Sequence, residues 1–139
     1  MKNLLTLVTL ILLLSANSAC KTEKPDVPQS NNIYTVSDVS YQSFVKSDKL
    51  VILYFKMNNC KFCAEMEPVI DKIAAKYHCN SIIGKIQYEN NPDLTLKFSV
   101  KSFPVTFFLI NETVVDTLSG SWEYSVVEKI VSSYESGCK

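Results

Sequence analysis

The sequence predicts an α/β domain in which a small mixed β-sheet carries helices on both faces. Strand-length apolar runs alternate with amphipathic segments along residues 33–134, the run Leu50–Phe55 is apolar throughout, and only a short turn separates the last two predicted strands. Strands that alternate with helices require crossover connections, whereas a tight turn joins antiparallel strands. The sheet is therefore predicted to contain both parallel and antiparallel pairs.

The first part of the domain supplies the predicted centre of the sheet. Ile33–Val36 is a short β-like run, and Ser37 is the predicted N-cap of a helix that follows. Leu50–Phe55 (LVILYF) has no polar position, which is typical of a strand buried on both faces. The helix between the two strands should direct three apolar side chains inward, namely Val39, Phe44 and Val45.

A second helix is predicted from Cys60 to about Tyr77, with Asn58 or Asn59 as its cap. Pro68 lies inside this segment and should bend the helix, because proline has no N–H to donate. Apolar residues recur at three- and four-residue steps and form one stripe that should face the sheet. The stripe consists of Cys63, Met66, Ile70, Ile73, Ala74 and Tyr77.

The remaining segments complete the fold in the order β-α-β-α-β-α-β-β-α. Helices are expected on both faces of the sheet, because crossover connections between parallel strands are right-handed. The remaining predicted elements are a strand at Ser81–Tyr88, a short helix from Asn91-Pro92, strands at Val105–Ile110 and Val114–Leu118 around a turn, and a helix from Trp122 to Tyr134.

Composition is that of one globular domain with a balanced charge. The chain has 139 residues, of which 47% are hydrophobic, enough for a buried core. Its 14 Lys and Arg residues are matched by 14 Asp and Glu residues. A neutral chain lacks the basic surface that holds phosphate backbones, so we expect no nucleic-acid partner.

Residues 1–19 have the pattern of a signal peptide. Lys2 supplies the positive charge, and Leu4–Leu14 is an apolar run, shorter than the roughly 20 residues of a membrane-spanning helix. Ser18-Ala19-Cys20 resembles the lipidation site of bacterial lipoproteins, although Asn17 stands where leucine is usual. The alternative is ordinary cleavage near Ala19, with Cys20 an incidental thiol.

The segment after Cys20 favours the lipoprotein interpretation. Residues 21–32 hold two prolines, four charged residues and a single aliphatic residue, which cannot form a core. The predicted organisation is therefore a signal peptide over 1–19, a lipid-anchored flexible tether over 20–32 and a folded domain over 33–139. The location that this implies is a bacterial membrane, facing the periplasm or the cell exterior.

The sequence Cys60-Lys61-Phe62-Cys63 stands where a buried strand ends and a helix begins. Three residues are close to one helical turn, so the two sulfurs can form a disulfide. Unpaired N–H groups and the macrodipole at a helix start favour an anion, and Lys61 adds positive charge. Such settings lower a cysteine pKa from about 8.5 to between about 3.5 and 7.5. Cys60 is the predicted nucleophile and Cys63, one turn deeper, the resolving thiol.

Other uses of a C-x-x-C pair are less consistent with the sequence. A zinc site usually needs a second pair of ligands, and the only histidine, His78, lies at the far end of the same helix, roughly 25 Å away at 1.5 Å per residue. A static structural disulfide would not require the position between strand and helix. We therefore expect neither a metal nor another cofactor.

From about Leu50 to Tyr134 the chain resembles thioredoxin. Beyond the C-x-x-C pair, the matching features are Pro68 five residues after the second cysteine, Lys85 in the next strand, Asn91-Pro92, Phe103-Pro104, and Gly120 before the last helix. The resemblance implies a thioredoxin fold in which Pro104 is cis, faces the cysteines and keeps metals off them. It also implies that the backbone of Phe103 pairs with the substrate, and that Lys85 points toward the buried site; the alternative is a solvated lysine.

Several positions depart from the thioredoxin pattern. Asn59 replaces the usual tryptophan before the first cysteine, and Lys61-Phe62 replaces the usual dipeptide between the cysteines. Tyr54 stands where the family has a buried aspartate, and Val105 where it has threonine after the cis-proline. Among these residues, Phe62 is the candidate for an apolar contact with substrate.

The predicted function is thiol–disulfide exchange with exported proteins through Cys60 and Cys63. Membrane anchoring suggests electrons relayed from a membrane-embedded redox partner, which favours reduction or isomerisation over oxidation. Two alternatives remain: a lipid-anchored accessory protein whose fold only binds a partner, and a chaperone that holds copper on two thiolates.

A second, structural disulfide is predicted between Cys79 and Cys138. Each cysteine follows the end of a predicted helix, and both helices should pack on the same face and end at the same side of the sheet. Lipidation of Cys20 and pairing of Cys60 with Cys63 would leave only these two thiols, in a compartment where disulfides persist. The alternative is two unrelated thiols.

Overall fold

The computed structural model describes residues 32–135 and contains a five-stranded sheet in the order β1-β3-β2-β4-β5. β2 is the central strand and is buried at all but its last residue, as predicted from its apolar sequence. The strands are β1 (Ile33–Thr35), β2 (Leu50–Lys56), β3 (Ser81–Gln87), β4 (Val105–Ile110) and β5 (Thr113–Ser119).

The sheet is mixed, as the order of elements predicts. β3 runs parallel to both β1 and β2, whereas β4 runs antiparallel to β2 and β5. In the β2–β4 pair, Phe55 lies opposite Val105. The end of β2 and the start of β4 therefore lie side by side at one end of the sheet, along the strand direction. α3 begins at this same end.

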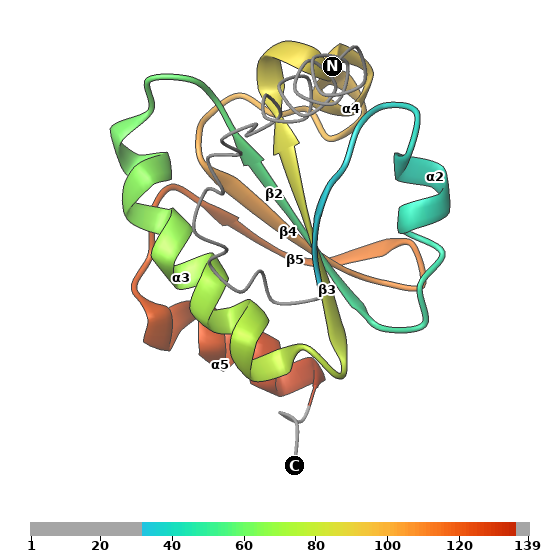
Figure 1. Cartoon of the computed structure of the whole chain (residues 1–139), viewed down its shortest axis with the longest axis vertical. Helices are drawn as coiled ribbons and strands as arrows, with labels where there is room; N and C mark the ends of the chain where they lie inside the picture. Colours follow the sequence, from blue (N-terminus) through green and yellow to red (C-terminus); the bar gives the residue numbers. More distant parts are fainter. Residues whose placement is uncertain (1–31, 136–139) are drawn as a thin grey trace, which may run out of the picture.

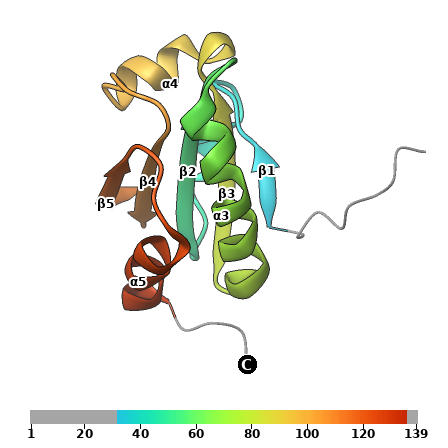
Figure 2. The ribbon, with the colours of Figure 1, turned by 90° about the vertical axis from the view of Figure 1, so that its left-hand side faces the viewer.

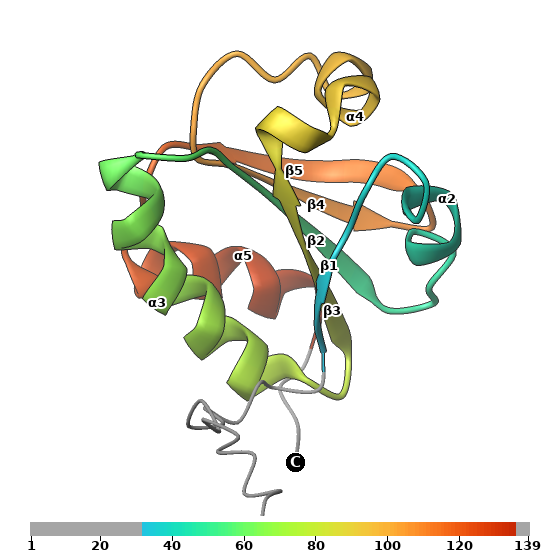
Figure 3. The same ribbon diagram turned by 45° about the horizontal axis from the view of Figure 1, so that its top comes forward.

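Helices cover both faces of the sheet, which forms the middle layer in Figure 3. α3 (Lys61–Tyr77) and α5 (Tyr124–Tyr134) lie together on one face, as Figures 1 and 2 show. The other face carries α2 (Tyr41–Phe44) and α4 (Pro92–Lys97), and a 3-10 turn, η1 (Tyr88–Asn90), joins β3 to α4. Among the described residues, no helix has the length and apolar character needed to cross a membrane.

Alternating residues of the strands divide the core into two layers. Leu50, Ile52 and Tyr54 of β2 face α3 and α5, whereas Val51, Leu53 and Phe55 face α2 and α4. All six residues of the predicted apolar stripe on α3 are buried, and five of them join the first layer. The sixth is Cys63, which lies in the first turn of α3.

The segment after β1 differs from the prediction. The helix there has only four residues, and Val39, expected to face inward, is 93% exposed. The cause is Asp38, whose carboxylate accepts the N–H groups of Asp93 and Leu94 at 3.2 and 2.9 Å. Because Asp38 caps the start of α4 in this way, residues 38–40 form a turn, and α2 begins at Tyr41 with Ser40 as its N-cap in place of the predicted Ser37.

Gly84 of β3 is packed so tightly that a larger residue should destabilise the fold. A β-carbon at this position would lie 2.7 Å from Val36 Cγ2 and 2.9 Å from Phe44 Cε1. We expect Gly84→Ala to lower the free energy of unfolding by about 1–3 kcal/mol, because the core has to shift. Urea unfolding measures this loss. The matched control, Val39→Ala on the exposed turn, should stay within about 0.5 kcal/mol of the unmodified protein; equal stability of both variants would contradict the packing argument.

Candidate active site

The chain turns from β2 into α3 through the four-residue loop 57–60, which ends at Cys60. Asn59 adopts a left-handed conformation with φ of 53°, which asparagine tolerates better than most residues. Cys60 itself is the N-cap of α3, and its Sγ accepts the N–H of Cys63 at 3.1 Å. The predicted caps, Asn58 and Asn59, are therefore wrong: the chain needs Asn59 for the turn, and the sulfur takes the capping position.

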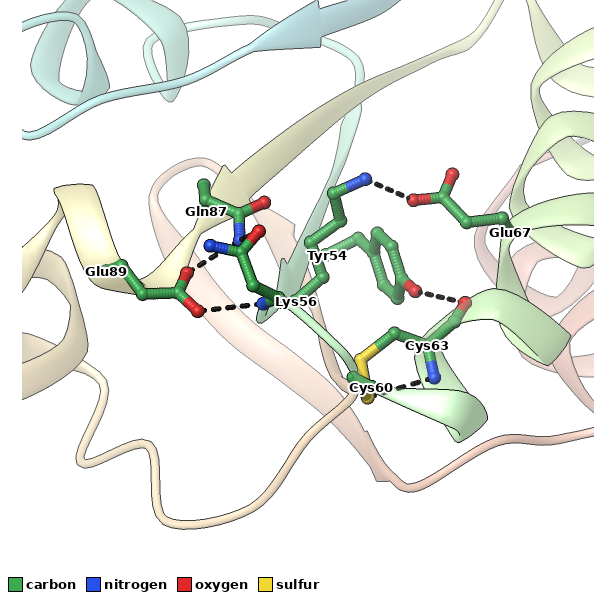
Figure 4. The surroundings of a disulfide bond; sticks show 8 residues. Tyr54, Lys56, Cys60, Cys63, Glu67, Gln87 and Glu89 are labelled. Atoms are coloured by element: carbon green, nitrogen blue, oxygen red, sulfur yellow. Dashed lines mark hydrogen bonds and ion pairs between the residues drawn. A yellow bond between two sulfur atoms is a disulfide. The ribbon is translucent and has the colours of Figure 1, made fainter.

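Cys60 and Cys63 form a disulfide at the start of α3 (Figure 4). The S–S distance is 2.12 Å and the Cα atoms are 5.2 Å apart. Cys60 is partly exposed, whereas Cys63 is buried. The two sulfurs thus differ in access to solvent, and both line a surface cavity of about 640 Å³.

Hydrogen bonds from β3 and η1 hold the loop before Cys60. The Glu89 carboxylate accepts the backbone N–H of Asn58 at 2.7 Å and the Gln87 side-chain amide at 2.6 Å. The Gln87 amide also donates to Asn58 Oδ1 at 3.1 Å. These bonds lower the pKa of Glu89, the largest effect coming from the Asn58 N–H. The anionic carboxylate therefore fixes the loop against the sheet (Figure 4).

The peptide bond between Phe103 and Pro104 is cis, as the resemblance to thioredoxin implied. Pro104 is buried directly before β4, at the end of the sheet where β2 also ends. Its carbonyl accepts the N–H of Gly120 at 2.7 Å, which ties the loop to the end of β5. The Phe103 ring packs on the Tyr88 ring with centroids 4.8 Å apart. The proline loop and the cysteines therefore lie at the same end of the sheet.

Tyr54 connects the core to the redox pair. Its side chain is fully buried, and its hydroxyl donates to the carbonyl oxygen of Cys63 at 2.9 Å (Figure 4). Burial raises the pKa of Tyr54 far above that of a free phenol, and the charges of Glu67 and Asp71 raise it further. Tyr54 therefore stays protonated at neutral pH and acts as a hydrogen-bond donor to the helix start.

A cluster of two lysines and two carboxylates lies beside Tyr54. Glu67 of α3 bonds Lys56 Nζ through one oxygen at 2.6 Å and Lys85 Nζ through the other at 2.5 Å, and Lys85 also reaches Asp71 at 3.0 Å. Burial alone would raise the pKa of Glu67, but the two lysines lower it overall. Likewise, burial opposes the charge on Lys85, yet Glu67 and Asp71 raise its pKa.

Lys85, Lys61 and Phe62 occupy different surroundings. Lys85 points into the cluster and is 20% exposed, so it is not the solvated lysine that sequence left as an alternative. Lys61 is 84% exposed, and its nearest carboxylate oxygen, on Glu65, is 3.9 Å away. Phe62, between the two cysteines in the sequence, is 57% exposed, consistent with its predicted position.

Sequence reasoning missed several residues around the site, among them Lys56 and Glu67. Both line the cavity that holds the cysteines. The signal for each was present in the spacing: Lys56 follows Tyr54 by two residues on the same face of a strand, and Glu67 follows Cys63 by one helical turn. No local pattern shows that these two charges pair, because β2 and α3 come together only in the fold.

Three other cysteines were singled out from the sequence. Cys79 lies just after α3, near the end of the sheet opposite the redox pair. Cys138 and Cys20 lie outside the described residues, as do the predicted signal peptide and nearly all of the tether. The Cys79–Cys138 disulfide and the lipidation of Cys20 therefore stay predictions.

Comparison with known proteins agrees with this geometry. The thioredoxin family model matches residues 32–133. Thioredoxin-1 of Drosophila yakuba is 30% identical over 95 residues, which are 68% of this chain and 89% of the fly protein. Thioredoxin of Chlorobaculum thiosulfatiphilum is 26% identical over 102 residues, 73% of this chain and 94% of the bacterial protein.

A solved structure shows the same fold. The thioredoxin of Malassezia sympodialis superposes with a TM-score of 0.66 at 18% identity, covering 73% of this chain and 88% of the fungal one. The chain therefore belongs to the thioredoxin family. With the Cys60–Cys63 pair in place, it is a thiol–disulfide oxidoreductase that acts on protein thiols and disulfides.

Proposed function

We propose that this protein is an exported, lipid-anchored reductase or isomerase of protein disulfides. The observation that carries the proposal is the unequal pair at the start of α3, where Cys60 is partly exposed and Cys63 is buried. Only an accessible thiol can reach a substrate, and only a covered one is kept for the internal step. Cys60 is therefore the nucleophile and Cys63 the resolving thiol.

The reaction proceeds in two exchanges. The Cys60 thiolate attacks one sulfur of a substrate disulfide, the substrate S–S bond breaks, and the other substrate sulfur leaves as a thiolate that takes up a proton. Cys63 then loses its proton and attacks Cys60, which forms the Cys60–Cys63 disulfide and releases the second substrate sulfur. The substrate gains two electrons, and a dithiol donor must return the pair to its reduced form.

The proposed substrate site is the surface at the end of the sheet that carries Phe103, Pro104 and the two cysteines. Pro104 cannot donate a backbone hydrogen bond, and it precedes β4 directly, so a substrate segment can pair with the backbone at Phe103. Phe62, more than half exposed, provides an apolar contact next to the attacking sulfur. Binding would remove apolar surface of Phe62 and of the substrate from water, which is favourable. Unfolded segments expose such apolar side chains, so they would be favoured as substrates.

The anchor and the redox partner are proposed from the sequence. The run Leu4–Leu14, the small residues before Cys20 and the polar segment 21–32 support export, lipidation and a tether. An anchor would keep the domain at the membrane surface, where a membrane-embedded dithiol protein can reduce the Cys60–Cys63 disulfide. Its substrates would be proteins exported to the same side of the membrane.

Lipidation of Cys20 can be tested directly. We expect the protein to incorporate labelled palmitate in a bacterial host and to partition into detergent, because Cys20 would become the lipidated first residue. Cys20→Ser should abolish the label and release the protein into the aqueous phase. Cys79→Ser is the matched control and should keep the label. An unmodified protein that carries no lipid mass and begins at residue 21 or earlier would refute the anchor.

Two assays on the same preparation test the proposed direction. Reduction of insulin by dithiothreitol measures reductase activity, and reactivation of scrambled ribonuclease measures isomerase activity. We expect the chain to accelerate at least one of them clearly above dithiothreitol or glutathione alone. Rates equal to background in both assays would instead indicate a protein whose fold only binds a partner.

A further inference from the structure

Of the two lysines that line the cavity of the redox pair, the less exposed one is not the lysine that the sequence indicates. Lys61 lies between the cysteines in sequence, yet its side chain is 84% exposed and extends along the helix surface toward Glu65. Both lysines line the cavity that holds Cys60 and Cys63, but the side chain of Lys56 is only 33% exposed. A charge that water covers less completely acts more strongly on its neighbours, because the local dielectric constant is lower.

The register of β2 explains how Lys56 reaches the pair. Successive residues of a strand point to opposite faces, so Lys56 shares the α3 face with Tyr54, whose hydroxyl touches the Cys63 carbonyl at 2.9 Å. Lys56 lies one pleat closer to the cysteine loop. Glu67, one helical turn after Cys63, receives the Lys56 ammonium at 2.6 Å. Figure 4 shows the Lys56 ammonium turned toward Glu67, with Tyr54 and the disulfide below them in this view.

We infer that Lys56 is the cation that stabilises the Cys60 thiolate once the disulfide is reduced, and that Glu67 competes with the thiolate for it. The inference rests on the proposed role of Cys60 as nucleophile. In the disulfide form the pair is neutral, and Glu67 alone compensates the charge of Lys56. Reduction adds a negative charge to the same cavity, and the flexible lysine stem allows the ammonium to respond to it.

The other charged groups around the cavity are committed elsewhere. Lys85 bonds two carboxylates, Glu67 at 2.5 Å and Asp71 at 3.0 Å, so its charge is compensated in both redox states. Glu89 is held by Asn58 and Gln87. The titratable groups that surround the pair are Tyr54 and Lys56 from β2, Lys61, Glu65, Glu67 and Asp71 from α3, Lys85 from β3, and Glu89 from η1.

The role of Lys56 predicts a shift in the Cys60 titration. A nearby opposite charge lowers an acid's pKa, so Lys56→Gln should raise the pKa of Cys60 by about one unit. At a pH below this pKa, alkylation of Cys60 should then be about ten times slower, because only the thiolate reacts. Lys61→Gln, the matched control, should change the pKa much less, and Lys56→Arg should restore a value near that of the unmodified protein.

Glu67 provides a second variant with the opposite sign. Glu67→Gln removes a negative charge from the cavity and releases Lys56, so it should lower the pKa of Cys60 and speed its alkylation. A cluster that only supported the fold would change the stability of both variants without moving the pKa of Cys60 in opposite directions. The sign of the two shifts therefore separates an electrostatic role from a structural one.

The experiment uses the full reduced chain and its variants. Iodoacetamide is added over a range of pH, and mass spectrometry of the peptides gives the alkylation rate of Cys60 separately from the other cysteines. A larger effect of Lys61→Gln than of Lys56→Gln, or shifts of the same sign for Lys56→Gln and Glu67→Gln, would overturn the inference. Insulin reduction and ribonuclease reactivation by the unmodified chain distinguish the two claims. A protein that is active in either assay, with unshifted variants, refutes only the role of Lys56, whereas one that is inactive in both refutes the proposed function.

Discussion

Replacing Cys60 with serine is expected to lower the rate of insulin reduction to that of dithiothreitol alone. A serine hydroxyl is not ionised at neutral pH, so the nucleophile of the first exchange is lost. Cys60 is the partly exposed sulfur of the pair, and no other described cysteine lines the cavity beside it. The measurement is the turbidity of insulin over time, with Val39→Ala on the exposed turn as the control that should keep full activity.

The variant Cys63→Ser should behave differently. Cys60 can still attack, but no internal thiol remains to release the substrate, so the mixed disulfide should accumulate. Non-reducing electrophoresis of the variant with a disulfide-containing substrate should show a covalent complex that disappears on addition of dithiothreitol. Complexes formed equally by Cys60→Ser and Cys63→Ser would contradict the assignment of the two roles.

Tyr54→Asp should have the largest effect on stability. The ring is fully buried, and its removal leaves a cavity that the smaller carboxylate cannot fill. We expect the free energy of unfolding at pH 7 to fall by at least about 3 kcal/mol, the range found when buried aromatic residues are truncated. Tyr54→Phe, which loses only the bond to the Cys63 carbonyl, should cost about 1 kcal/mol. Urea unfolding compares the two variants.

The stability of Tyr54→Asp should also depend on pH. Burial raises a carboxyl pKa above its unfolded value of about 3.9, so the penalty of the charged form appears as the pH rises through that value. The difference from Tyr54→Phe should therefore shrink as the pH falls below the unfolded pKa, where the carboxyl is neutral in both states. A difference that does not change with pH would show that the carboxylate is solvated.

The same substitution should speed the internal exchange. Cys63 has to lose its proton before it attacks Cys60. Burial raises the pKa of Tyr54, so its hydroxyl is already protonated at neutral pH and cannot take up this proton. A carboxylate at position 54 can accept it, so single-turnover release of the mixed disulfide should be several times faster in Tyr54→Asp. Tyr54→Phe is the control and should resemble the unmodified protein. Equal release rates in both variants would show that water or another group takes the proton.

Much of the fold could be predicted because its patterns are local. The apolar run of β2 and the stripe on α3 follow the periods of a strand and a helix, and the structure places both as expected. The segment around Val39 could not be predicted in the same way. Its conformation depends on Asp38 and α4, which are separated by 55 residues in the sequence, and no local pattern reveals such a contact.

The site was predicted in its sulfur chemistry but not in its electrostatics. The C-x-x-C spacing identified the cysteine pair, and the resemblance to thioredoxin anticipated the cis bond before Pro104. Lys61 was chosen as the local cation because it is adjacent in sequence, whereas in the structure Lys56 lines the same cavity and is much less exposed to solvent. Adjacency along a helix directs successive side chains away from each other, so it is a poor guide to electrostatic contact.

The reduction potential of the Cys60–Cys63 pair tests most directly whether the pair is catalytic. The full chain is equilibrated with buffers of known potential, and trapped thiols are quantified separately for Cys60 and Cys63. We predict a midpoint between about −270 and −120 mV, the range of catalytic dithiols. A midpoint below about −300 mV, typical of disulfides that only support a fold, would contradict the proposal that this pair exchanges electrons with substrates.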